Sequence, residues 1–260
     1  MMDRRSVLVG MLGGVVVGGG AGVFAGQQSV RPPPPPKETD YNRSYAQQGE
    51  DLVVGSILAD LRIDNKARFL DIGAHHPIRS NNTYLFYTVG YRGVLVEPNP
   101  YYVDLIKKHR PEDTVLPVGI GIDDQTEADY YVIRGDGQLN TFSKAQADAH
   151  ERENKGAIER VEKRQLVRLD KVLEKHFSAG APAFVSMDVE GLDLAILKTL
   201  DFDRWRPAVF CIETATVTGD IDAGIAALLQ EKGYVIRGGS AVNTVFVDKK
   251  RLEGHGHHHG

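Results

Sequence analysis

The sequence predicts an α/β domain built on a doubly wound, mostly parallel β-sheet that ends in a C-terminal antiparallel hairpin. From residue 67 onward, short apolar runs of strand length alternate with helical patterns. The last two apolar runs, YVIRG and NTVFVDK, follow each other without a helix between them. Strands separated by helices pair in parallel under helices on both faces, whereas adjacent strands form a hairpin. A chain of 260 residues suits one such domain of about 200 residues plus appendages.

The order of the expected elements follows from these runs. Strands are predicted at 67–73, 93–99, 114–121, 128–133, 182–191 and 207–214, before the hairpin. Helices are predicted at 52–61, 101–109, 171–177, 192–200 and 221–232. Pro117 implies an irregularity or an edge position in the third strand. The polar segment 143–164 is predicted to be a helical insertion that covers the functional site on the side where the substrate binds.

Charge and cysteine usage narrow the function classes. A net charge of −4 argues against a nucleic-acid partner bound through a broad basic surface. The single cysteine, Cys211, lies in the apolar run VFCIE and is predicted to pack as a small core residue.

A cofactor site is predicted where the first two strands end. Asp71, Gly73 and Ala74 end the first strand, and Glu97 and Pro98 end the second. Glycine lets the backbone approach a cofactor closely. The Asp71 carboxylate could hold a water or the amino group of a methionine moiety, and Glu97 could accept hydrogen bonds from both ribose hydroxyls.

The turn after the first strand favours one nucleotide-like cofactor over another. The sequence AHHP follows Gly73, so the G-x-G-x-x-G loop that holds a pyrophosphate at a helix N-terminus is missing. S-adenosylmethionine (SAM) carries no phosphate, so it is favoured over NAD. His75 in this turn could act as a base, line the pocket, or simply pack within the turn.

Three carboxylates are predicted at the ends of later strands and are the candidate catalytic groups. Asp188 and Glu190 end the strand at 182–191, and Glu213 ends the strand at 207–214. Asp188 is also predicted to contact the cofactor. Neighbouring carboxylates repel one another unless they share a proton, a cation or substrate hydroxyls. One could take the proton of a hydroxyl during methyl transfer, and together they could hold Mg²⁺. Alternatively, Glu190 or Glu213 caps a helix or pairs with Lys198 or Arg206.

With these residues in hand, the chain resembles the FkbM family of SAM-dependent methyltransferases. The resemblance is carried by SYAQQGEDL, FLDIGAHHP, SNNTYLFYTVGYRGVLVEPNP, FVSMDVEGLDLAILKTLDF and RPAVFCIE. It implies the class I methyltransferase (Rossmann-like) fold and methyl transfer, usually to oxygen. It also implies that Asp71, Gly73 and Glu97 contact the cofactor and that the DVEG segment is an active-site strand end. Many members continue after Gly73 with Asn and a second glycine, where this chain has His75 and His76.

Two functions are consistent with these observations. The first is O-methylation of a hydroxyl on a sugar, glycoconjugate or natural product, with a small molecule or glycan as acceptor. The second is a membrane-tethered, catalytically degenerate protein that keeps the fold for binding or scaffolding.

The two ends of the chain are predicted to lie outside the domain, which spans residues 41–250. Residues 1–30 read as a membrane anchor through 7–24, a cleaved Sec signal, or a twin-arginine-like signal containing RRSVL. Glycines at every fourth position could form a ridge for helix–helix self-association: Gly10, Gly14, Gly18, Gly22 and Gly26. Residues 31–40 are a Pro-rich linker, and residues 251–260 a His-rich tail or tag remnant. We expect a cytoplasmic catalytic domain, where the methyl donor is made, with export as the alternative.

Overall fold

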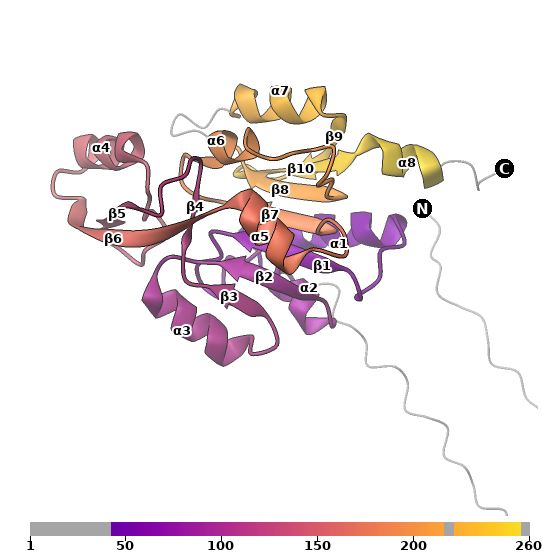
Figure 1. The fold of residues 1–260 in the computed structure, drawn as a ribbon, viewed down its shortest axis with the longest axis horizontal. Coiled ribbons are helices and arrows are strands. Elements are labelled where there is room, and N and C mark those ends of the chain that lie inside the picture. The colour runs from indigo at the N-terminus through magenta and orange to yellow at the C-terminus, as the bar shows by residue number, and fades with distance from the viewer. Residues whose placement is uncertain (1–42, 216–220, 256–260) are drawn as a thin grey trace, which may run out of the picture. The chain divides into compact units, whose positions relative to one another are not determined.

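The computed structural model describes residues 43–215 and 221–255, and its main feature is a seven-stranded sheet. The strands stand in the order β3-β2-β1-β7-β8-β10-β9, which can be followed across Figure 1. Their bounds are β1 Arg68–Ile72, β2 Arg92–Val96, β3 Thr114–Leu116, β7 Phe184–Met187, β8 Val209–Glu213, β9 Tyr234–Gly239 and β10 Asn243–Asp248. The pairs β3–β2, β2–β1, β1–β7 and β7–β8 are parallel, and β10 is antiparallel to β8 and β9. The predicted fold class is confirmed.

The strand order reverses between β1 and β7, and this reversal locates the site. From β1 the chain builds outward through β2 and β3, and later returns to build outward on the other side through β7 and β8. In open parallel sheets such a reversal leaves a crevice beyond the carboxyl ends of the central strands. The functional site is expected there.

Helices cover both faces of the sheet because side chains alternate between the faces along each strand. Phe69 of β1 packs with α1 (Glu50–Asp60), α2 (Tyr84–Thr88) and α3 (Pro100–His109). Leu70 and Ile72, on the opposite face, pack with α5 (Leu169–His176), α6 (Asp193–Leu197) and α7 (Ala223–Glu231). Cys211 is fully buried in the first of these cores, as predicted.

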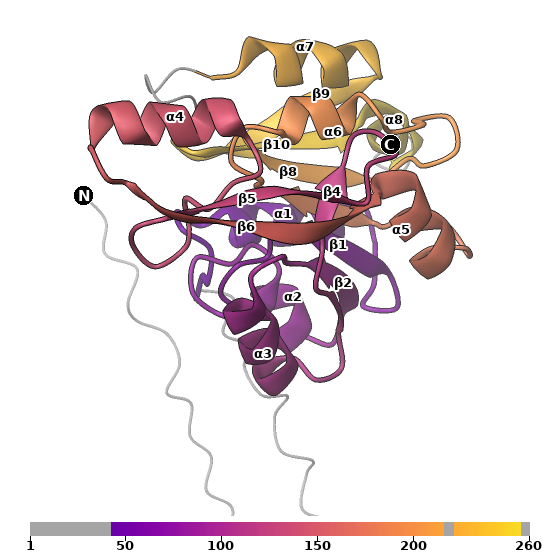
Figure 2. The same cartoon turned by 60° about the vertical axis from the view of Figure 1, so that its left-hand side comes forward.

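A second, three-stranded sheet extends to one side of the main sheet together with α4 (Lys144–Glu153) (Figures 1 and 2). Its order is β4-β6-β5, with β4 Gly119–Gly121, β5 Glu127–Ile133 and β6 Ile158–Arg168. The predicted helical insertion at 143–164 is therefore wrong in its second half, which is strand. Charged residues hide the strand pattern of β6, and cross-strand pairs such as Lys163 with Asp129 at 2.7 Å hold it to β5.

Pro117 has a larger effect than the predicted irregularity. The run 114–121 is divided into β3 and β4, which belong to different sheets. Proline has no N–H for a strand ladder, so pairing stops there and the chain leaves the main sheet.

The segment SYAQQGED contains two buried acids at the start of α1, Glu50 and Asp51, which hold neighbouring segments of the domain together. Asp51 accepts hydrogen bonds from the Ser44 hydroxyl at 2.6 Å and the Tyr45 amide at 2.7 Å. Glu50 accepts hydrogen bonds from Ser240 at 2.6 Å and Asn243 at 2.9 Å. This part of the family motif thus fastens the N-terminal segment to the β9–β10 hairpin.

The ends of the chain differ in what the structure says of them. Helix α8 (Lys249–His255) carries the fold past residue 250 into the predicted tail, and Leu252 packs against the core. The predicted anchor or signal, its glycine ridge and the whole predicted linker lie outside the described residues. Within residues 43–215 and 221–255, no helix has the length and apolar character needed to cross a membrane.

Candidate active site

Two adjoining cavities lie at the carboxyl ends of the central strands. The larger has a volume of about 560 Å³ and is reached by β1, β7 and β8. The smaller, of about 50 Å³, lies at the ends of β1, β2 and β7. The residues lining both are Gly73, His75, Gln138, Asp188 and Glu190. One ligand could therefore occupy the two cavities together.

The backbone at this junction is unusually tight. Gly73 has φ +82°, and a Cβ on it would lie 1.8 Å from the carbonyl oxygen of Asp188. Glycine is therefore required for β1 and β7 to meet at their ends. His75 (φ +48°) and Glu190 (φ +53°) are also left-handed, a conformation that costs non-glycine residues energy and is concentrated at functional sites.

Glu97 is buried at the end of β2 and lines the smaller cavity. One carboxylate oxygen accepts the His75 amide at 2.8 Å, and the other accepts the Asn99 amide at 2.7 Å. Burial raises the pKa of Glu97 to about 7, although both amides favour the charged form. Each oxygen keeps a further lone pair, so the carboxylate can accept two hydroxyl protons from a ligand.

Apolar side chains form much of the remaining wall of the smaller cavity, and the loop between β5 and α4 closes it. Ile120, Tyr130 and Phe142 contribute to its walls. The Asp136 carbonyl in this loop accepts a hydrogen bond from the Tyr102 hydroxyl and lies 3.3 Å from Nε2 of His75. The rings of His75 and Tyr102 are in contact, with centroids 3.9 Å apart. Burial lowers the pKa of His75, which favours a neutral ring.

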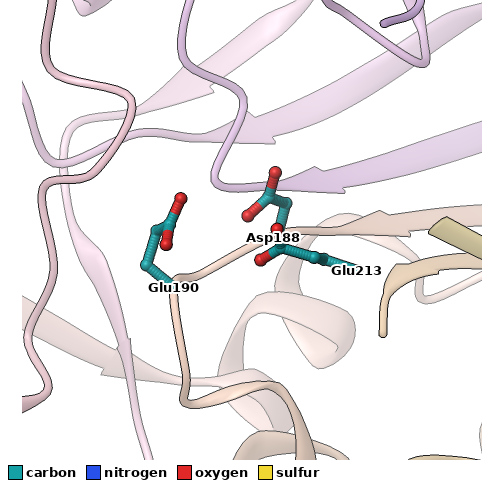
Figure 3. Close-up of side chains that lie close together, drawn as sticks. All are labelled: Asp188, Glu190 and Glu213. Atoms are coloured by element: carbon teal, nitrogen blue, oxygen red, sulfur yellow. The ribbon is translucent and has the colours of Figure 1, made fainter. Parts of the chain in front are cut away.

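Asp188, Glu190 and Glu213 form a carboxylate cluster in the larger cavity (Figure 3). One carboxylate oxygen from each lies within 4.8 Å of the others. Two unit charges at that distance repel by about 3 kcal/mol at an effective dielectric constant of about 20. Burial, followed by repulsion from Asp188, raises the pKa of Glu190 to about 8 and that of Glu213 to about 10. Burial raises the pKa of Asp188 as well. The cluster therefore retains protons near neutral pH.

Helix α4 completes the wall of the larger cavity with Gln146 and His150. Nε2 of His150 is buried and has no hydrogen-bond partner among the described residues. Asp193, whose pKa burial raises to about 7, lies in the wall near the cluster, and Asp222 lies nearby in the same wall. The cavity thus combines strand-end acids with polar side chains from an element distant in sequence.

Comparison with known families decides the assignment. The methyltransferase FkbM domain matches residues 71–236. The chain belongs to the FkbM methyltransferase family. It is therefore a SAM-dependent methyltransferase by family, and the strand ends described above lie within the matched range. No curated protein sequence matches the chain significantly.

Solved methyltransferase structures are similar to this FkbM methyltransferase at low identity. A TehB-like SAM-dependent methyltransferase from Corynebacterium glutamicum is 11% identical, with a TM-score of 0.41 over 78% of this chain and 89% of that one. Precorrin-6y C5,15-methyltransferase from Geobacter metallireducens is 13% identical, with a TM-score of 0.39 over 80% and 95%. An O-methyltransferase from Bacillus cereus in complex with SAH is 11% identical, with a TM-score of 0.37 over 76% and 80%.

Most of the site residues predicted from the sequence of this FkbM methyltransferase meet at the two cavities. Gly73, Glu97, Pro98, Asp188, Glu190, Glu213 and His75 line one or both. Ala74 is buried in the core beside them. Among the described residues neither glutamate takes its alternative role as a helix cap: Leu192 occupies the N-cap position of α6, and the Asp222 side chain caps α7. Arg206 pairs with Asp248 at 2.8 Å instead.

Asp71 is the predicted cofactor residue that the structure places elsewhere. It lines neither cavity and is 3% exposed. Its Oδ2 accepts the Thr83 hydroxyl at 2.6 Å and is 3.4 Å from the Asn81 amide nitrogen. Both partners also accept hydrogen bonds from fully buried Arg110, at 3.0 and 3.1 Å. Asp71 thus stabilises the turn after β1 through its contacts with Thr83 and Asn81.

Sequence reasoning missed Arg110, His150 and the loop residues around Asp136. Arg110 follows Lys107 and Lys108 at a helix end, where basic residues usually face solvent. His150 lies in a polar helix with no pattern that singles it out. Its position across the larger cavity from the strand-end acids is seen only in the structure.

Proposed function

We propose that the chain transfers a methyl group from SAM to a hydroxyl oxygen on a sugar, glycoconjugate or natural product. The observation that carries this proposal is the junction of a Glu97 cavity with a carboxylate cavity at one strand-order reversal. The first supplies ribose recognition, and the second supplies acceptors for a hydroxyl proton.

The residues of the smaller cavity suit the nucleoside part of SAM. Glu97 presents free lone pairs for two ribose hydroxyls, and Ile120, Tyr130 and Phe142 form an apolar surface for adenine. The cavity of about 50 Å³ is narrow for a purine. We therefore expect the β5–α4 loop to move outward at Asp136 when the cofactor enters.

The residues of the larger cavity suit the reacting part of SAM and the acceptor. SAM supplies a methyl group on a positively charged sulfonium, which acidic walls favour. A carboxylate of the cluster then receives the acceptor proton, and burial and the neighbouring acids make it a stronger base than an exposed one. His150 on α4 lines the same cavity, and we expect it to contact the acceptor. Water exclusion and in-line placement provide the remaining acceleration.

Calorimetry on the purified full chain tests cofactor binding. We expect SAM and its demethylated product to bind the wild type, and Glu97→Ala to weaken binding at least about tenfold, since both ribose hydrogen bonds to a charged group are lost. Glu153→Gln on exposed α4 is the matched control for the loss of one negative charge. The absence of both heat and thermal shift with either ligand in the wild type would contradict the proposal.

Incubation with methyl-labelled SAM and extracts tests the acceptor class. We expect label in an alkali-stable form, as a methyl ether is, and loss of transfer in Glu213→Gln. Label recovered in alkali-labile esters or on amines would refute O-methylation of a hydroxyl.

We also propose that residues 7–24 attach the domain to a membrane with the catalytic part on the cytoplasmic side. The cytosolic supply of SAM supports this orientation. Cell fractionation with external protease tests it. Recovery of the chain in the soluble fraction, or degradation of the domain in intact cells, would contradict it.

A further inference from the structure

The larger cavity has an unbalanced charge. Five carboxylates line it, and no lysine or arginine does among the described residues; the acids are Asp188, Glu190, Asp193, Glu213 and Asp222. Arg206, one of the partners predicted for these glutamates, is engaged by Asp248. Carboxylates packed together in one cavity are paired with a cation or share protons. No described side chain that lines the cavity supplies a permanent positive charge.

One oxygen of the cluster also lacks a partner among the residues that the structure describes. Oδ1 of Asp188 is buried and accepts no hydrogen bond from them. Neighbouring Asp193 differs, because its Oδ1 is 3.3 Å from the Val189 amide nitrogen that donates to it. A buried carboxylate oxygen without a donor costs free energy, so it indicates a ligand that binds there.

We propose that Asp188, Glu190 and Glu213 bind one hard divalent cation with the coordination chemistry of Mg²⁺. One oxygen from each residue lies within 4.8 Å of the others. Opposite ligands of Mg²⁺ are about 4.2 Å apart and those of Ca²⁺ about 5 Å, but at most one pair among three ligands is opposite, and adjacent ligands of Mg²⁺ are only about 3 Å apart. The cluster therefore has to contract around the ion. Carboxylates are the ligands that both ions prefer.

The role of the cation follows from the shape of the site and rests on the proposed function. Three carboxylates leave open coordination positions that face the cavity, where an acceptor hydroxyl can bind. A hydroxyl on the cation is more acidic and held in one orientation. During transfer the methyl carbon–sulfur bond breaks with its electrons moving to sulfur, and the carbon–oxygen bond forms. The hydroxyl proton passes to a cluster oxygen that does not bind the cation. The acidic lining of the cavity disfavours an anionic acceptor, so the acceptor is then a hydroxyl compound without a negative charge.

Thermal unfolding of the full chain with MgCl₂ or CaCl₂, against NaCl of equal ionic strength, tests the ion site. These two ions are chosen because the chain ends in GHGHHHG, and imidazole prefers transition metals. We expect a saturable rise in Tm of about 3 °C or more at roughly ten times the Kd. Glu213→Gln and Glu190→Gln should unfold no earlier than the wild type without metal, because repulsion is reduced, and should lose the response to Mg²⁺. Glu153→Gln should keep it.

Calorimetric titration of MgCl₂ and of SAM into the same proteins separates the two proposals. A wild type that binds SAM without any ion-specific response overturns the cation site and leaves the proposed function standing. A wild type that responds to the ion but binds no SAM overturns the proposed function and leaves the cation site standing. An ion response that persists equally in Glu213→Gln and Glu190→Gln also overturns the site, because the ion then binds elsewhere.

Discussion

Arg110 provides the sharpest test of how this fold supports its site. Its guanidinium is fully buried, pairs with Asp113 at 2.9 Å and donates to Asn81 and Thr83. Asn81 in turn donates to the Ala74 carbonyl at 3.0 Å, which fixes the turn between β1 and the smaller cavity. Arg110→Met keeps a long apolar stem but removes the charge and the hydrogen bonds that the guanidinium donates to Asp113, Asn81 and Thr83.

The expected cost of Arg110→Met is about 3–5 kcal/mol of unfolding free energy, the range for leaving one partner of a buried ion pair uncompensated. This is a large part of the roughly 5–15 kcal/mol that stabilises a typical domain. Asp71 and Asp113 already have pKa values raised by burial and lowered by Arg110, so their pKa values rise further in the variant. A group whose pKa is higher in the folded state than in the unfolded state stabilises the fold at pH values below its unfolded-state pKa. This stabilisation is lost as the pH rises. The deficit should therefore be larger at pH 7.5 than at pH 4.5.

Urea denaturation followed by circular dichroism at the two pH values measures this deficit. Arg110→Met/Asp113→Asn should recover a substantial part of the loss, because the uncompensated charge is gone while the asparagine oxygen can still accept the Gly93 amide. A cost below about 1 kcal/mol at pH 7.5, or a double variant no more stable than the single one, would refute the reasoning.

Three further predictions concern the strand ends. Gly73→Ala should lose at least about 2 kcal/mol of stability, because its Cβ meets the Asp188 carbonyl, whereas Gly156→Ala, with the same φ of +82° but open space, should lose about 1 kcal/mol; equal losses in urea denaturation would contradict this. Glu97, with a pKa of about 7, gives stability that is present below about pH 4.5 and lost as pH rises through 7, so unfolding free energy should fall by up to about 3 kcal/mol from pH 4.5 to 8. SAM affinity should rise over the same pH range as the carboxylate ionises; a flat profile for both quantities would be inconsistent with this. Asp71→Asn should leave the Kd for SAM within about threefold by calorimetry, since its carboxylate lines neither cavity, and a larger loss in a folded variant would restore it as a cofactor residue.

The positions of the strand ends were predictable because they follow from local patterns. A short apolar run that ends in a polar residue and a turn marks the carboxyl end of a strand. Glu97, Asp188 and Glu213 were identified in this way, and the alternation of strands and helices predicted the parallel sheet that places them at one edge. The sequence could not tell which face of the sheet Asp71 joins. It lies within β1, one residue before Ile72, and strand alternation turns it toward the core of α1, α2 and α3.

The sequence by itself determined the fold class, the strand-end acids and the family, since each depends on residues that are close along the chain. Only the tertiary structure decided which acids share a cavity, how the Arg110 network supports the turn after β1, and that α4 brings His150 to the larger cavity. These depend on contacts between distant segments, and a charged helix end or a polar helix looks the same in sequence whether it faces water or a cavity. The same limit applies to β6. It becomes a strand through its pairing with β4 and β5, which its own charged sequence does not indicate.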